Sequence, residues 1–596
     1  MKKVKALLVG VAAMSGCATA TTTSGNSTAP VAGSEWVETT LSRMTLREKA
    51  AQMVWPTVLG DYTSGDSPQW QHLTQYVRDE KVGGFTISVG SPTEVASKLN
   101  ALQEMSSVPL FFGADLEAGA GFRARGGYFI PNAIDLGGAV VFPPEMAIGA
   151  TGDTSLAYEQ GKLTAIEGRA LGIHIAYAPV LDVNNNPANP VINTRSYGED
   201  PALDAKLGAA FIRGVQDNGM IATGKHFPGH GDTGTNSHLA LPVVTVSRSR
   251  LDSVELVPFR AAVSSGVGAI MSFHGAMPAL DSSGVPGTLS QKVLTDLLRN
   301  ELEFRGMIIS DAMDMEGVLQ QYGAVEAVKR AVAAGVDILI QPLNVTQTID
   351  AVVDGVKEGR YTEARLNESV RRILKAKANL GLDRRRTVSL DSLRYVVGDS
   401  SHTEVSRRIA ARSITLVKDS LGTVPLKGLS TGRVLSVTVG RRADLSAGVA
   451  FNGELRTRIR SLRAEFLAAE DPSADYARME RLADSSDVVI VSSYVGQNWD
   501  AVSASAPQAF ASFVQRLSAK GKRLIVVSFG NPYLLQQIPF VPAYVVAWGG
   551  FPPSQAAAAR SLIGAQAITG KLPISIPLAN TTVMRGSGIL RNVTNP

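Results

Sequence analysis

Short apolar runs alternate with longer amphipathic stretches from residue 54 to residue 340, and this alternation constrains the fold more than any other feature. The apolar runs have the length of buried strands, and the segments between them are long enough for a helix that crosses back over a sheet. This pattern predicts repeated βα units with parallel strands. The candidate strands are residues 54–56, 84–87, 110–115, 175–179, 220–223, 269–274, 307–311 and 336–340. Eight such units predict a closed (β/α)8 barrel of the TIM type.

Polar side chains follow the ends of several of these runs. Parallel barrels gather the carboxyl ends of their strands at one mouth, which is where α/β folds place reacting groups. We therefore expect a common site for Asp115 with Glu117, Asp182, Lys225 with His226, His274, and Asp311.

The loop after the fifth run holds the densest group of reactive side chains. Residues 225–233 read KHFPGHGDT, and His238 follows closely, so a cation, three imidazoles and a carboxylate lie within one Gly/Pro-punctuated segment. The spacing of these histidines and Asp232 matches no recognised zinc pattern, so no metal is expected. No P-loop or dinucleotide fingerprint follows any run, so no nucleotide cofactor is expected either.

A second, smaller α/β sandwich domain is predicted after the barrel. The amphipathic segment 362–374 is expected to be the closing helix of the barrel, which we assign to residues 37–382. Residues 383–405 are interpreted as a linker, and residues 406–596 as the second domain. Buried parallel strands are expected there at residues 434–437, 487–491, 523–527 and 543–546.

The amino terminus has the character of an export signal, assigned to residues 1–20. A basic start precedes the apolar residues 6–14, which are too few to span a membrane as a mature helix. Cys17, the only cysteine, stands in a sequence that resembles a bacterial lipobox, whereas cleavage after Ala20 would give a soluble secreted form. We expect a periplasmic or outer-surface protein with a lipidated Cys17, tethered by the flexible residues 21–36.

The distribution of charge bears on the partners of the chain. The formal net charge is +5, but the basic residues are scattered and form no stripe interleaved with aromatic side chains. A nucleic-acid partner is therefore not expected. The oligomeric state is left open.

Three motifs together resemble glycoside hydrolase family 3, and within it the β-N-acetylglucosaminidase branch. They are TRSYGEDP at residues 194–201, KHFPGHGDT at 225–233 with Ser237-His238 after it, and SDAMDM at 310–315. Two later segments, 530–533 and 570–577, are similar to patterns in the second domain of the family. The resemblance covers the chain from about Leu41 to Pro577.

The resemblance implies a retaining glycosidase that works through a covalent glycosyl-enzyme without a metal or cofactor. It assigns Asp311 as the nucleophile and His238 as the general acid/base, an imidazole where most glycosidases use a carboxylic acid. The sugar-binding residues that it implies are Asp115, Arg195, Lys225 and His226. From the residues alone, Asp311 could instead cap a helix, and Arg195 and Lys225 could form structural ion pairs.

Two positions depart from the family pattern. Asn236 stands where the family has an aspartate that pairs with the acid/base histidine, and an amide accepts a hydrogen bond but supplies no negative charge. Asp232 is the nearest carboxylate in sequence that could compensate. Ala118 replaces a glycine of the family's Glu-Gly-Gly-Arg pattern. The substrate that this segment of the site would select is therefore left open.

The prediction is an exo-glycosidase that releases terminal β-linked N-acetylglucosamine from cell-wall fragments or chitin-type oligosaccharides. One alternative is a β-glucosidase or other exo-β-glycosidase of the family, with its acid supplied by the second domain. Another is a glycan-binding surface lipoprotein with weak or no turnover. The acceptor could be water or phosphate, because a neutral histidine repels phosphate less than a carboxylate does.

Overall fold

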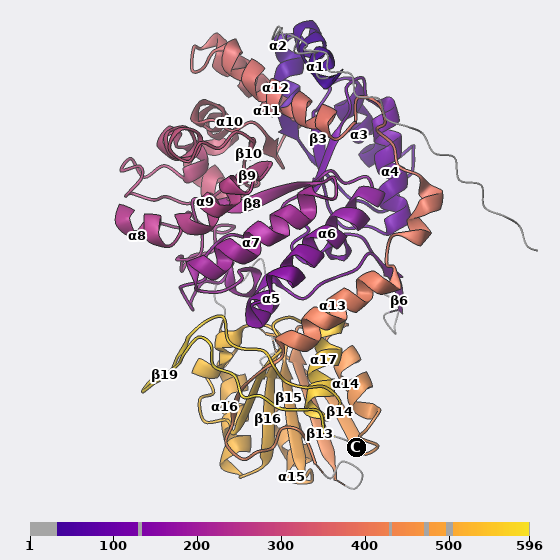
Figure 1. Ribbon diagram of the computed structural model, residues 1–596, viewed down its shortest axis with the longest axis vertical. Coiled ribbons are helices and arrows are strands. Elements are labelled where there is room, and N and C mark those ends of the chain that lie inside the picture. Colours follow the sequence, from indigo (N-terminus) through magenta and orange to yellow (C-terminus); the bar gives the residue numbers. More distant parts are fainter. Residues whose placement is uncertain (1–31, 129–133, 428–431, 470–475, 496–504, 595–596) are drawn as a thin grey trace, which may run out of the picture.

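The computed structural model describes residues 32–128, 134–427, 432–469, 476–495 and 505–594. Figure 1 shows a larger amino-terminal body stacked on a smaller sheet-containing domain, with helix α13 (Ser400–Ser413) at the junction. The signal and lipobox predictions, including Cys17, lie outside the described residues. Within them, no helix combines the length and apolar character needed to cross a membrane.

The amino-terminal strands form a ring of parallel strands. The sheet runs in the order β10-β9-β8-β7-β4-β3-β2, β1 pairs with β11, and a parallel bridge from Ile309 to Ile338 joins β10 to the approach of β11. The strands are β1 (Val54–Trp55), β2 (Thr57–Val58), β3 (Gly84–Ile87), β4 (Phe111–Ala114), β7 (Ile175–Ala176), β8 (Ile221–Phe227), β9 (Ala269–Ser272), β10 (Met307–Ile309) and β11 (Leu339–Ile340). Pro56 divides β1 from β2, so the two act as one strand of the barrel. The predicted (β/α)8 barrel is confirmed, with a strand in each of the eight expected runs.

Helices cover the outside of this barrel. Several begin at side-chain caps, such as Asp153, Asp200 and Thr362, whose oxygens accept backbone N–H groups of the first turn. The helices include α3 (Pro68–Arg78), α4 (Pro92–Met105), α6 (Thr154–Ala170), α7 (Pro201–Gln216), α9 (Leu256–Ser264), η4 (Lys292–Glu301), α10 (Glu316–Ala334), α11 (Val345–Lys357) and α12 (Glu363–Asn379). The predicted closing helix is α12, which continues beyond residue 374.

Two stretches expected to lack regular structure are partly helical. Helix α1 (Ala32–Arg43) starts inside the predicted tether, because Val37 and Leu41 are buried and Trp36 packs against the barrel core. Helix α13 starts inside the predicted linker, which also holds the short helix η5 (Leu390–Tyr395). Ser406 of α13 donates to the carbonyl oxygen of Val141 in the barrel domain at 2.7 Å.

The carboxyl-terminal domain is a three-layer α/β sandwich. Its sheet has the order β12-β17-β16-β15-β13-β14, parallel except for the antiparallel edge strand β12. The strands are β12 (Thr415–Asp419), β13 (Val434–Gly440), β14 (Leu462–Ala468), β15 (Val488–Ser493), β16 (Arg523–Ser528) and β17 (Ala543–Val546). Helices pack on both faces, and they include α14 (Val449–Arg456), α15 (Tyr476–Asp484), α16 (Gln508–Ala519) and α17 (Pro552–Leu562). The two-domain prediction is confirmed, although the edge strands β12 and β14 were not predicted.

A short barrel helix joins the two cores. Helix α5 (Glu145–Thr151) places Met146, Ala147 and Ala150 in the same apolar cluster as Trp548 of the second domain. The second domain therefore packs against the barrel next to the residues that follow β4 and β7.

Candidate active site

The predicted site residues meet in one cavity at the mouth of the barrel. The cavity has a volume of about 210 Å³, and both Asp311 and His238 line it. Its lining also includes all four predicted sugar-binding residues, Asp115, Arg195, Lys225 and His226. The barrel thus brings together residues that are as far apart in the sequence as Asp115 and Asp311.

Buried ion pairs form the floor of this cavity. Lys225 Nζ lies 2.8 Å from Asp115 Oδ1 and 2.7 Å from Glu117 Oε1, and its side chain is 2% exposed. Arg123 Nη2 donates to the other oxygen of Asp115 at 2.5 Å. Burial opposes the charge of Asp115, but Lys225 and Arg123 outweigh it and hold the pKa of the carboxyl far below its usual value.

Arg195 is fixed by a second carboxylate. Its Nη2 and Nε donate to the two oxygens of Glu117 at 2.6 and 2.9 Å, a bidentate pair. Burial raises the pKa of Glu117, but Arg195 and Lys225 lower it more, to about 2. Arg195 and Lys225 are therefore both ion-paired and part of the cavity wall, so the ion pairs do not remove either side chain from the site.

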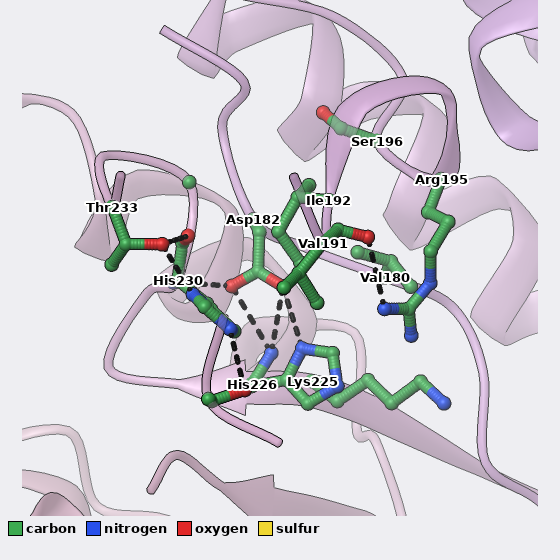
Figure 2. A network of polar contacts seen from close by, with 12 residues as sticks. Val180, Asp182, Val191, Ile192, Arg195, Ser196, Lys225, His226, His230 and Thr233 are labelled. Carbon is green, nitrogen blue, oxygen red and sulfur yellow. Dashed lines mark hydrogen bonds and ion pairs between the residues drawn. The ribbon is translucent and has the colours of Figure 1, made fainter. Parts of the chain in front are cut away.

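Asp182 positions the histidine-rich loop, as Figure 2 shows. Its carboxylate accepts from the ring Nδ1 of His226 at 2.7 Å and from the backbone N–H of His230 at 2.6 Å. Asp182 is fully buried, and the neighbouring imidazoles offset that burial and lower its pKa. With Nδ1 of His226 held in this way, Nε2 is the ring nitrogen left for a ligand.

His230 stabilises the loop that carries His238. Its ring nitrogens lie 2.8 Å from Thr233 Oγ1 and 3.0 Å from Ser237 Oγ, and its ring centroid is 4.3 Å from that of Phe273. Burial lowers the pKa of His230 to about 3, so the ring is neutral near pH 7. Since Ser237 is adjacent to His238, this contact fixes the backbone beside the expected acid/base.

Asp311 is held as a carboxylate directly after β10. Its Oδ1 accepts the N–H of Ala312 at 2.8 Å, and His274 Nε2 lies 2.9 Å from the Ala312 oxygen. Burial favours the neutral acid, but His226, His274 and the Ala312 N–H outweigh it and hold the pKa of Asp311 below its ordinary value. The N-cap residue of α10 is Met315 and not Asp311, and an ionised oxygen at the cavity wall is suited to act as a nucleophile.

The amide of Asn236 contacts the imidazole of His238. Asn236 Oδ1 lies 3.0 Å from Nδ1 of His238 and also accepts its backbone N–H at 3.0 Å. Burial lowers the pKa of His238, and the charge of Arg195 adds to this, while Asp311 opposes it. Asp232, the suggested compensating carboxylate, lies 4.0 Å from Arg250, whereas the His238 ring contacts Asn236.

Several residues in and around the cavity were not assigned a role from the sequence. Glu117 and Asp182 were predicted to lie near the site because they follow strands. Their ion-pair partners, Arg195 and His226, could be identified only from the structure. Asp314, which follows Asp311 by three residues, also lines this cavity. Among the described residues, no cluster of three or more His, Cys, Asp or Glu side chains could hold a metal ion.

Comparison with known proteins agrees with this architecture. Residues 45–376 match the glycosyl hydrolase family 3 N-terminal domain, and residues 315–591 match the glycosyl hydrolase family 3 C-terminal domain. The chain belongs to glycoside hydrolase family 3. Enzymes of this family are retaining glycosidases, so the family assignment and the enzyme class predicted from the motifs are confirmed.

Individual relatives extend over most of this family 3 chain. It is 34% identical over 412 residues to a beta-N-acetylglucosaminidase/beta-glucosidase of Cellulomonas fimi, covering 68% of this chain and 70% of the relative. A family 3 beta-N-acetylglucosaminidase from Paenibacillus sp. str. FPU-7 superposes with a TM-score of 0.77 at 32% identity, covering 90% of this chain and 100% of that one. The beta-glucoside phosphorylase BglX superposes with a TM-score of 0.80 at 26% identity, covering 92% and 97%.

Proposed function

We propose that this family 3 enzyme is an exo-acting β-N-acetylglucosaminidase that hydrolyses terminal β-linked N-acetylglucosamine with retention. The observation that carries the proposal is the placement of Asp311 and His238 on the wall of one sugar-sized cavity. The names of the Cellulomonas and Paenibacillus relatives support the choice of sugar.

The proposed reaction has two displacements. The Asp311 carboxylate attacks the anomeric carbon while the bond to the leaving oxygen breaks and His238 gives that oxygen a proton. The transferable proton is on Nε2, because Nδ1 faces the Asn236 amide. In the second step His238 takes a proton from water as the water displaces Asp311, and two inversions give retention.

The floor of the cavity supplies the hydrogen bonds to the sugar ring. Asp115 offers acceptor oxygens, and Arg195 and Lys225 offer donors, all fixed by the ion pairs described above. Preorganised groups of this kind lose little freedom when the substrate binds.

A β-glucosidase is the second candidate, because the Cellulomonas relative carries both names. In that alternative a carboxylate of the second domain would act as the acid. The second-domain residue that lines the cavities around His238 is Phe551, and no carboxylate of that domain lines them among the described residues. His238 itself lines both cavities, and this placement supports His238 as the acid.

Covalent trapping tests the proposed function. A 2-deoxy-2-fluoro-type glycoside should label the protein, and mass spectrometry should find the sugar on the peptide that contains Asp311. Chromogenic N-acetylglucosaminide and glucoside, compared on the wild type, should show preference for the former. A folded protein that takes up no label and turns over neither substrate would instead support a glycan-binding protein without catalysis.

We also propose that the enzyme is exported and anchored through a lipid on Cys17. The basic start, the short apolar segment and the lipobox-like sequence before Cys17 support this proposal.

A further inference from the structure

A second chamber opens beside the sugar cavity. It has a volume of about 240 Å³ and shares Val191, Arg195 and His238 with the first cavity. Asp311 lines the first cavity but not this one. The chamber therefore adjoins the sugar cavity at His238 and Arg195, and Asp311 is not part of its wall.

Both domains build the walls of this chamber. Phe122 of the barrel and Phe551 of the second domain face each other edge to face, with ring centroids 6.4 Å apart and planes at 86°. Phe551 is the N-cap residue of α17. The loop before it lies against the barrel so closely that a Cβ on Gly549 would be 2.6 Å from Cδ of Pro144, another lining residue.

The reaction geometry determines which part of the substrate points into the chamber. The acid must contact the glycosidic oxygen, and the nucleophile must contact the opposite face of the anomeric carbon. A group attached through that oxygen therefore lies on the side of His238 and away from Asp311. At about 240 Å³ the chamber is as large as the cavity for the sugar ring, so it has room for a second ring.

The charged groups in the chamber disfavour an anionic group. The Arg195 guanidinium is already neutralised by the bidentate Glu117 carboxylate. Glu145 adds a carboxyl that is 1% exposed, and burial together with the nearby Glu117 raises its pKa and so favours its neutral form. A carboxylate on the ligand would lose its hydration in a chamber lined largely by apolar side chains, whereas a neutral ring would meet Phe122 and Phe551.

We propose that this chamber is the leaving-group subsite and that it selects an uncharged, ring-sized aglycone, with Phe551 of the second domain as a specificity-determining residue. A second N-acetylglucosamine unit fits this description, whereas a sugar carrying a free carboxylate does not. The inference rests on the proposed function and narrows it toward chitin-type oligosaccharides over acidic cell-wall fragments.

The first test compares two substrates on the Phe551→Ala variant. N,N′-diacetylchitobiose needs the chamber, whereas β-N-acetylglucosaminyl fluoride keeps the acetamido group but has no aglycone ring. The variant should lose about tenfold or more in kcat/KM on chitobiose and remain within about twofold of wild type on the fluoride. Phe466→Ala, at an exposed position on β14, is the matched control and should affect neither substrate.

Equal losses of kcat/KM on both substrates would overturn the proposal, because Phe551 would then be needed for folding or for contact with the acetamido group. No loss on either would also overturn it. The proposed function is judged separately, since turnover of the fluoride by the wild type, with label on Asp311, does not depend on the chamber.

A second test needs no variant, so it holds even if Phe551→Ala fails to fold. The wild type is given 4-carbamoylphenyl and 4-carboxyphenyl β-N-acetylglucosaminides, which match in shape and differ in charge. We expect kcat/KM to be about tenfold lower for the carboxylate. Equal rates, or a faster carboxylate, would show that the chamber does not select against negative charge.

Discussion

At the scale of single residues, the amide of Asn236 determines how readily His238 holds a proton. The amide accepts from the ring and fixes its orientation, but it adds no negative charge to a histidine whose pKa burial already lowers. The acid step needs the protonated ring, so the reaction rate should fall as pH rises through this lowered pKa.

Asn236→Asp should therefore extend activity to higher pH. A carboxylate beside the ring raises the pKa of His238, so the descending limb of kcat/KM should move upward by about one pH unit. Full pH profiles on an aryl N-acetylglucosaminide measure the shift. Asn236→Ala, which removes the hydrogen bond without adding charge, should not move the limb upward. An unchanged limb in Asn236→Asp would mean that this carboxylate does not couple to the acid.

Glu117→Gln should both destabilise the protein and weaken substrate binding. The change removes a buried charge that faces Arg195 and Lys225, which leaves two buried cations with a single carboxylate partner, Asp115. We expect the free energy of unfolding to fall by about 3–5 kcal/mol, measured by denaturant titration, and KM to rise. Glu104→Gln, on an exposed barrel position, should stay within about 0.5 kcal/mol. Equal stability of the two variants would contradict this account.

At the scale of elements, burial decided what the sequence could predict. The barrel strands are buried on both faces and are continuous apolar runs, so each was found from its composition. Strand β14 was missed because it lies at the edge of its sheet, where Arg463 and Phe466 are exposed and the apolar run is broken. The site residues that follow barrel strands were predicted from the sequence, because each stands at the end of an apolar run. Phe551 was not predicted, because its place in the chamber wall depends on how the two domains pack and no local sequence pattern indicates that packing.

The loop before α17 gives an element-scale prediction. Gly549→Ala would place a methyl group against Pro144 and push the start of α17 away from the barrel. We expect about a fivefold loss in kcat/KM on chitobiose with little change on the glycosyl fluoride. Gly453→Ala, in α14 with nothing within 4 Å of the new Cβ, should leave both rates unchanged. Unaltered chitobiose kinetics in Gly549→Ala would show that this loop tolerates displacement.

At the scale of the whole molecule, the two domains share polar and apolar contacts. Glu199 of the barrel accepts from both the backbone N–H and the hydroxyl of Ser575 at 2.7 Å, and Asn184 donates to the Tyr533 hydroxyl at 2.8 Å. Met146 of α5 also lies in the apolar core of the second domain. Such an interface couples the folding of the two domains.

Scanning calorimetry should accordingly show one cooperative unfolding transition. The interface residues would be exposed if either domain unfolded first, so the calorimetric and van't Hoff enthalpies should agree. Met146→Asp, which places a charge in the shared core, should split the transition in two. Two transitions in the wild type would mean that the domains unfold independently.

The proposed export through a lipoprotein signal is tested on the full-length chain. The full-length protein, expressed in a bacterial host with a labelled fatty acid, should carry the label and sediment with membranes. Cys17→Ser should remove the label and release the protein into the soluble fraction. A mature amino terminus at Thr21 in the wild type would indicate the secreted form instead.

The ion pairs on the cavity floor have a consequence for the conditions under which the enzyme works. Because the carboxylates of Asp115 and Glu117 offset most of the positive charge of Lys225, Arg195 and Arg123, only a weak electric field extends from the pocket into solvent. A neutral sugar is then held by short-range hydrogen bonds alone, and its affinity should change little between dilute and brackish surroundings. We therefore expect KM for an uncharged N-acetylglucosaminide to stay within about twofold between 10 mM and 500 mM NaCl, measured by steady-state kinetics.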